Sequence, residues 1–187
     1  MEIDKIRLFN PKLIEPIVSM TDDEMWQFIV ANEERVKEIV NSEAHAISGF
    51  LWGYRYGMER IRELFLKDIE YYREGVDFTM IMDFCFKGEP VQLDYWARCG
   101  YLDDADSCDA VTSNDIIPEI DEDSDEAFYK EYFHLLELQQ VENIIRSMEE
   151  NFDKLTINTR EDIDKIKAMK QFCLENEDYK VAYIYDL

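Results

Sequence analysis

Hydrophobic residues recur every three to four positions in four stretches of this chain, and they alternate with other residues near both ends. A step of three to four residues places side chains on one face of a helix, whereas alternation is typical of a strand. The first pattern predicts helices over residues 21–40, 42–73, 139–152 and 159–176. The second predicts strands over residues 5–9 and 180–186.

Polar residues and glycines mark where these helices begin and end. Thr21 and Glu24, three positions apart, form a capping box at the start of the first helix. Ser42 and Thr159 are N-cap residues for the second and the last helix, and Gly75 closes the second.

Two apolar segments leave their secondary structure open. Residues 76–86 (VDFTMIMDFCF) end before Gly88 and Pro90 and predict a buried strand, with a short helix as the alternative. Residues 134–138 either extend the helix that follows or form a strand before it. Together the patterns predict a helix-rich α+β fold with a small sheet that includes the C-terminal strand. A chain of 187 residues is compatible with a single domain over residues 1–187.

Three glycines lie four residues apart in the second predicted helix: Gly49, Gly53 and Gly57. Glycine inside a helix costs about 1 kcal/mol relative to alanine, so a row of three predicts close approach of another backbone. We expect that backbone to belong to the same chain. A homodimer through the Gly49, Gly53 and Gly57 face and a break in the helix are the alternatives.

The charge of the chain changes the picture most. Its 43 acidic residues outnumber 20 basic ones, for a formal net charge of −23, while 47% hydrophobic residues are enough for a core. No basic residue occurs between Arg98 and Lys130, and residues 99–129, here called the acidic run, carry eleven carboxylates. The other 156 residues have a net charge of −12. We expect a long acidic loop at about residues 102–126, because Pro118 and many aspartates disfavour regular structure.

An acidic surface limits the partners that the protein can bind. Nucleic acid needs Lys and Arg for counterion release, and anionic membranes attract the same residues, so we expect neither as a direct partner. A basic protein or a cation suits this charge. No uncharged apolar stretch approaches about 18 residues and no signal-peptide pattern is visible, so we expect a cytoplasmic protein.

Candidate catalytic groups are few. The four cysteines lack the spacing of zinc ligands and are expected to be reduced structural thiols: Cys85, Cys99, Cys108 and Cys173. His45 and His134 are the two histidines, and neither stands in a signature for nucleophilic catalysis. We expect no cofactor.

Among small ligands, calcium is the one whose binding motif the sequence matches best. Asp121, Asp123 and Asp125 match positions 1, 3 and 5 of an EF-hand loop. Position 6 is Glu126, where glycine is needed, and position 12 is Tyr132, where a bidentate glutamate is needed. We therefore expect weak, diffuse cation binding and no specific metal site.

Aromatic residues stand on both sides of the acids, with Tyr95, Trp96 and Tyr101 before them and Phe128, Tyr129 and Tyr132 after them. Charge steers encounter with a partner, and aromatic side chains supply anchors that lose their water on binding. This composition resembles that of acidic immunity and inhibitor proteins that neutralise nucleases or mimic DNA. It predicts a non-enzymatic module that binds and inhibits a basic protein, for example a nucleic-acid enzyme. The predicted partner-binding residues are Trp96, Tyr101, Asp103, Asp104, Asp106, Asp121, Glu122, Asp123 and Asp125.

Two other functions remain open at this point. The first is a small enzyme or ligand-binding domain whose pocket uses the tyrosine-rich strands, and a deep apolar pocket containing His45 or His134 would favour it. The second is a cation-binding regulator. A flat acidic face with exposed aromatic residues would favour protein binding over both.

The last third of the chain carries a family resemblance. HLLELQQVENIIRSMEENF from His134, a second helical segment and the final KVAYIYD are similar to the C-terminal part of YfbM-like bacterial domains. GFLWG at 49–53 and KGEP at 87–90 are similar to the same family. The resemblance implies an α+β fold, and the family supplies no activity to carry over.

Overall fold

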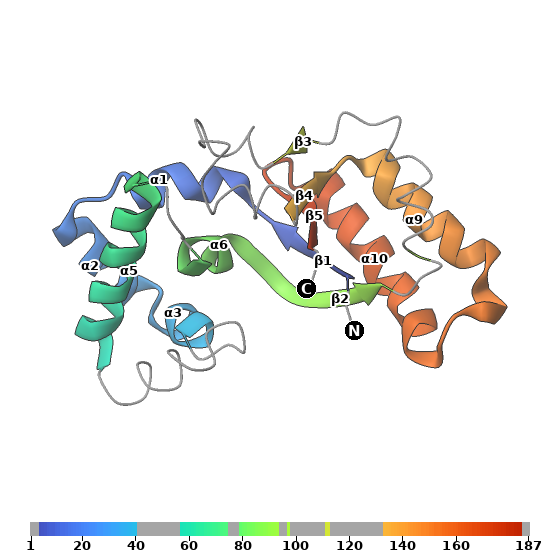
Figure 1. Ribbon diagram of the computed structural model, residues 1–187, viewed down its shortest axis with the longest axis horizontal. Helices are drawn as coiled ribbons and strands as arrows, with labels where there is room; N and C mark the ends of the chain where they lie inside the picture. The colour runs from blue at the N-terminus through green and yellow to red at the C-terminus, as the bar shows by residue number, and fades with distance from the viewer. Residues whose placement is uncertain are drawn as a thin grey trace. The chain divides into compact units, whose positions relative to one another are not determined.

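The computed structural model describes residues 4–40, 57–74, 79–93, 97, 111–112 and 133–184. Its contacts divide the chain into two compact units. Residues 1–11 and 87–187 form one, here called the sheet unit, and residues 12–86 form the other, here called the helical unit (Figure 1). The predicted α+β class is confirmed, with a small sheet that includes the C-terminal strand. The single-domain assignment stays a prediction.

The sheet has five strands in the order β2-β1-β5-β4-β3. They are β1 (Asp4–Phe9), β2 (Phe86–Leu93), β3 (Val111–Thr112), β4 (Phe133–Leu136) and β5 (Lys180–Ile184). Strands β1 and β4 both pair antiparallel with β5, which places the C-terminal strand at the centre. The two predicted terminal strands are confirmed. The open choice for residues 134–138 is settled as a strand, which ends at Leu136.

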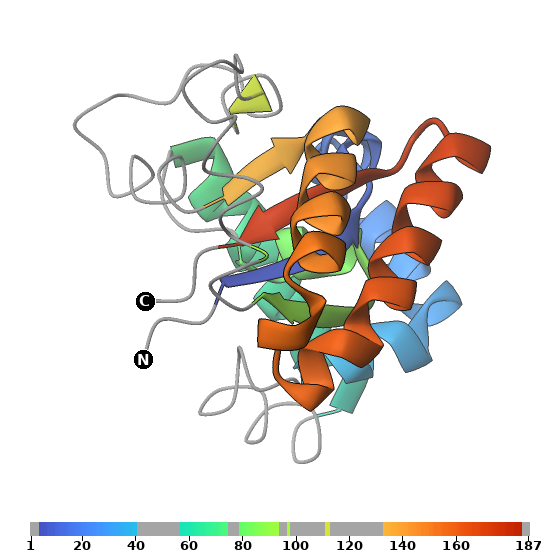
Figure 2. The same cartoon turned by 90° about the vertical axis from the view of Figure 1, so that its right-hand side faces the viewer.

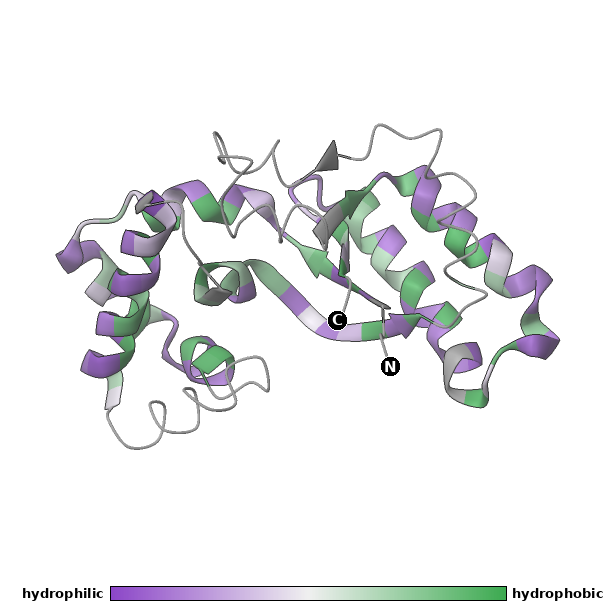
Figure 3. Ribbon diagram, viewed as in Figure 1, coloured by the Kyte–Doolittle hydropathy of each residue, from purple (hydrophilic) through white to green (hydrophobic). Residues whose placement is uncertain are grey.

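Two helices between β4 and β5 cover one face of the sheet (Figure 2). Helix α9 (Leu138–Glu150) begins with a capping box between Glu137 and Gln140, and a 3-10 turn, η4 (Phe152–Lys154), leads to α10 (Ile157–Glu175). Their apolar faces and the strands share one core (Figure 3), whose fully buried members include Ile6, Ala97, Val141, Ile144, Met148, Ile166 and Tyr183. The helices predicted over residues 139–152 and 159–176 are confirmed, with one change at a start.

The cap predicted at Thr159 is wrong. Helix α10 begins at Ile157, and its first backbone bond already runs from the Arg160 amide to the Thr156 carbonyl, 3.1 Å away. The threonine three residues earlier therefore stands at the boundary, and Thr159 lies inside the first turn. Both threonines suit a helix start by type, so the sequence pattern alone did not separate them.

The helical unit contains η1 (Pro11–Leu13), α1 (Ile14–Val18), α2 (Asp22–Ala31), α3 (Glu33–Val40), α5 (Gly57–Glu74) and α6 (Thr79–Cys85). The capping box at Thr21 is confirmed, because the Thr21 amide donates to Glu24 Oε2 at 2.8 Å and the Glu24 amide donates to Thr21 Oγ1 at 3.4 Å. The Thr21 backbone bond, with the Thr21 hydroxyl second, lowers the pKa of the Glu24 carboxyl. This side chain therefore stays charged beside the positive end of α2.

The single helix predicted over residues 21–40 is wrong, because Asn32 separates α2 from α3. Its backbone leaves helical geometry at φ −120° and ψ 27°. The Asn32 side-chain amide donates to the Phe28 carbonyl at 2.9 Å, alongside the Asn32 main-chain amide at 3.0 Å. Asparagine side chains compete in this way with regular helix bonding, which explains the break in the backbone at this residue. The apolar stripe in the sequence continues across the break and does not reveal it.

The strand predicted over residues 76–86 is also wrong, and the helical alternative is correct. Residues 79–85 form α6, and the strand follows as β2. The buried Asp68 side chain on α5 accepts a bond from the Ile81 amide at 2.8 Å, which satisfies a donor in the first turn of α6. Gly88 and Pro90, expected to end the apolar segment, lie within β2, where an edge strand tolerates them.

The row of glycines behaves differently at the one position that the structure describes. Gly57 opens α5 with φ +68°, in the left-handed region, and a Cβ placed there would meet no atom of the described residues within 4 Å. Among the described residues nothing packs closely on Gly57, and this glycine serves backbone conformation. Ser42, Gly49 and Gly53 lie outside the described residues, so the packing and homodimer predictions for them stay predictions.

Candidate functional site

The nine predicted partner-binding residues lie outside the described part of the chain, as do His45, Cys99 and Cys108. The structure does place both ends of the segment between β3 and β4. Val111 pairs with Leu135 and Thr112 pairs with His134 in an antiparallel ladder at the end of the sheet. Thr112 and Phe133, the described residues that flank residues 113–132, therefore lie on neighbouring strands. This segment holds seven of the eleven carboxylates of the acidic run.

Arginines in the helical unit bind main-chain carbonyls. Arg35 Nη2 donates to the carbonyls of Asp83 and Phe86 at 3.1 and 2.9 Å. Arg73 donates to the Val18 carbonyl at 2.8 Å, and Arg62 donates to that of Asp22. Such bonds use the guanidinium donors inside the fold.

The sheet unit uses two arginines in the same way. Arg7 Nε donates to the Gly88 carbonyl at 2.5 Å, which links β1 to β2. Arg160 donates to the carbonyls of Phe152 and Asp153 at 2.9 and 3.0 Å and lies over the Phe152 ring. It thereby holds the turn between α9 and α10.

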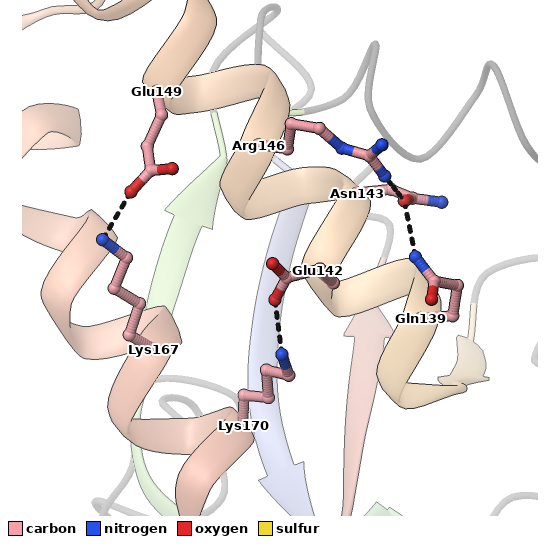
Figure 4. A network of polar contacts seen from close by, with 7 residues as sticks. All are labelled: Gln139, Glu142, Asn143, Arg146, Glu149, Lys167 and Lys170. Carbon is pink, nitrogen blue, oxygen red and sulfur yellow. Dashed lines mark hydrogen bonds and ion pairs between the residues drawn. The ribbon is translucent and has the colours of Figure 1, made fainter.

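Lysines form ion pairs across the two helices of the sheet unit (Figure 4). Lys170 binds Glu142, and Lys167 binds Glu149 at 2.5 Å, so each pair joins α10 to α9. The hydrogen bond from Lys170 lowers the pKa of the Glu142 carboxyl, and the bond to Glu149 raises the pKa of the Lys167 amine. All four side chains are partly exposed to water, which screens the attraction within each pair.

A second polar group lies along α9 itself. The Asn143 side-chain oxygen accepts from Gln139 at 3.0 Å and also from Arg146 (Figure 4). Asn143 is 7% exposed, so these bonds satisfy an acceptor that burial would otherwise leave without a partner.

Depressions on the described surface include two with different linings. One, of about 330 Å³, is lined by Glu142, Ile145, Glu149, Lys167, Lys170, Gln171 and Leu174, so the two ion pairs form its walls. The other, of about 440 Å³, lies in the helical unit and is lined by Met20, Asp22, Leu66, Ile69, Glu70 and Arg73. Neither is the apolar, histidine-containing pocket that an enzyme or a ligand-binding domain would favour.

The balance of charge differs sharply between the described residues and the rest. Described residues include 17 of the 20 basic side chains and 26 of the 43 acidic ones. The remaining 17 carboxylates stand beside only three basic residues in the sequence, Arg55, Arg98 and Lys130. Within the described part, at least ten basic side chains form ion pairs or bind main-chain carbonyls, and Arg35 does both. Most of the described cations thus contact carboxylates or carbonyls within the fold.

The two cysteines that the structure describes are buried free thiols, as predicted for them. Burial, and secondly the charge of Asp83, raises the pKa of Cys85 to about 12. Burial also raises the pKa of Cys173, against a smaller opposing effect of Lys180. Only the thiolate is a nucleophile, so neither sulfur suits covalent catalysis near neutral pH.

The described residues contain no group of three or more His, Cys, Asp or Glu side chains placed to hold a metal ion. Among the same residues, none of the helices has the length and apolar character needed to cross a bilayer. Comparison with protein-family models, with curated proteins and with solved structures found no match to the chain. The similarity of the last third to YfbM-like domains therefore stays a prediction.

Proposed function

We propose that this protein binds a basic protein through its acidic run, without catalysis, and acts as an inhibitor or immunity-type protein. One observation carries the proposal: eleven carboxylates and no basic residue in residues 99–129. Uncompensated charge of one sign accelerates association with a partner of the opposite sign, because the field acts before contact.

The engagement of the described cations supports this function. A neighbouring lysine or arginine that was free to move would neutralise the acids within the chain. Five arginines instead hold main-chain carbonyls, and the Glu142–Lys170 and Glu149–Lys167 pairs join two helices. Recruiting these cations to the acidic run would break contacts inside the fold. That cost supports an external cationic partner for the acidic run.

The antiparallel pairing of β3 and β4 also supports the proposal. Thr112 and His134 lie opposite one another, so the segment between them starts and finishes at one place on the sheet. The two ends of this segment are therefore neighbours at that end of the sheet, and seven carboxylates of the acidic run lie between them in the sequence. A cationic groove that binds nucleic-acid phosphates would accept such a concentration of carboxylates, so a nucleic-acid enzyme is the partner class that we propose.

Affinity purification at low and high salt, followed by mass spectrometry, would identify the partner. Association kinetics then test the site with the triple variant Asp121→Asn, Asp123→Asn and Asp125→Asn. We expect slower association and a weaker dependence of its rate on salt, because exposed charges act over about 8 Å at physiological ionic strength.

A matched control changes the same amount of charge elsewhere. Glu150, Glu161 and Glu177 are exposed carboxylates on the sheet unit, and replacing all three with glutamine also removes three negative charges. We expect a smaller change in the association rate from this variant. Equal effects of the two triple variants would show that only net charge matters. An association rate indifferent to salt and to both variants would refute the proposed function.

A further inference from the structure

We propose that helix α6 couples the helical unit to the edge of the sheet, because side chains from α3 and α5 hold both of its ends and its chain continues directly into β2. With seven residues, α6 is too short to be stable alone, so its order depends on what it contacts. It packs against α1, α3 and α5. Its order therefore reports the state of the helical unit.

The first end of α6 is held from α5. The Asp68 carboxylate, 7% exposed, accepts from the Ile81 amide at 2.8 Å. A first-turn amide has no partner within its own helix, and a buried one left unbonded would be costly. Asp68 thus fixes where α6 begins.

The second end is held from α3. Arg35 Nη2 donates to the carbonyls of Asp83 and Phe86, both of which lie where the helical bonding of α6 runs out. A guanidinium also complements the negative end of a helix dipole. Arg35 thus fixes where α6 stops and the strand starts.

No residue separates α6 from β2, since Cys85 ends the helix and Phe86 begins the strand, and Figure 1 shows the continuous ribbon. Phe86, the last residue of the helical unit, is held by Arg35. Two residues further on, the Gly88 carbonyl accepts from Arg7 of β1, and Val91 and Leu93 are buried in the core of the sheet unit. One strand is therefore anchored in both units.

The consequence is a conformational link. If α6 loosens, β2 loses the anchor at its first residue, and the rest of the strand is an edge strand paired on one side only among the described residues. Opening of an edge element draws on local stability, which such an anchor sets. By the same linkage, a change that rigidifies β2 favours the ordered state of α6.

Hydrogen exchange followed by mass spectrometry tests the link on the full chain. We expect Arg35→Met to accelerate amide exchange about tenfold or more in peptides from both α6 and β2, because a hydrogen bond from a charged group is lost at the junction. Peptides from β4 and β5 should change little. Asp68→Asn keeps an acceptor oxygen for the Ile81 amide and should have a smaller effect.

The matched control is Arg62→Met, which removes another carbonyl-binding guanidinium from the helical unit, at α2 and not at α6. We expect it to leave exchange in β2 unchanged. If Arg35→Met prevents folding, Arg35→Lys retains the charge and offers a milder test of the same contact. Faster exchange in α6 without any in β2 would overturn the coupling. Unchanged exchange in both would overturn it as well, because Arg35 would then not hold the junction.

Discussion

Single residues with unusual surroundings decide several features of this fold. Asp68 is one of them, and its position in the sequence already indicates that it is buried. It falls between Phe65 and Ile69 on the apolar face of α5. A carboxylate among core positions indicates a buried acceptor that needs a donor. The sequence does not say which donor, because the Ile81 amide lies 13 residues away. That partner depends on tertiary packing.

Gly57 gives a prediction in which the sign of the effect discriminates between two structures. We expect Gly57→Ala to lower the free energy of unfolding by about 1–2 kcal/mol, because an L-residue is strained at a φ of +68° although there is space for its Cβ. Alanine at a right-handed helical glycine would instead raise it by about 1 kcal/mol.

Urea unfolding of the purified variant measures this difference. Gly88, at φ +72° and also with open space around it, is the parallel case, and Gly88→Ala should destabilise as well. A gain in stability at position 57 would mean that a regular helix runs through Gly57.

At the scale of elements, the apolar period predicts the type of most elements, but it does not show where the backbone breaks within a stripe. The helices of the C-terminal half follow patterns of four or five turns, and both terminal strands were also identified in advance. The break at Asn32 was missed because the apolar face continues across it, and the contact that ends α2 is a side-chain bond to a carbonyl. Residues 76–86 are ambiguous in the sequence because a short apolar run fits either period.

The pairing of α9 with α10 leads to a prediction about pH. In a double-mutant cycle of Glu142→Gln and Lys170→Met, we expect a coupling energy below about 1 kcal/mol near pH 7, as for other partly exposed pairs. The folded pKa of Glu142 is lowered below its ordinary 4.5. The stabilisation is therefore present above that value and is lost as the pH falls through the folded pKa.

Urea unfolding of the four proteins of the cycle, at neutral pH and at a pH low enough to protonate Glu142, provides the measurement. A coupling energy that persists after protonation would mean that packing, and not charge, joins these side chains. The single variants serve as controls for changes in packing.

On the scale of the whole molecule, charge is what the sequence revealed best. The acidic run and the net charge can be read from the sequence without a structure, and both support the proposed function. The sequence does not predict which cations make contacts inside the fold, because an arginine that binds a carbonyl looks like any other arginine in the sequence. The geometry of the proposed binding residues lies outside the described part of the chain.

Net charge yields a prediction for the intact protein. We expect the melting temperature to rise when sodium chloride is added from about 0.01 M to 0.15 M, as the Debye length shortens from about 30 Å to about 8 Å. Repulsion within a chain of net charge −23 is then screened more than the contact ion pairs are stabilised.

Differential scanning calorimetry at constant pH measures the shift. The triple variant at Asp121, Asp123 and Asp125 should melt at a higher temperature in low salt and respond less to added salt. A melting temperature that falls with salt would indicate that attractive pairs outweigh repulsion.

Strand β2 has a further consequence, for behaviour in concentrated solution. It is the last strand in the sheet order, and its residues 87–90 are exposed: a lysine, a glycine with left-handed backbone, a glutamate and a proline. Proline offers no amide to a new strand, and charged side chains and a local twist oppose alignment with a second chain. These features disfavour pairing of the β2 edge with a strand of a second molecule. We therefore expect the protein to resist fibre formation while its native fold persists.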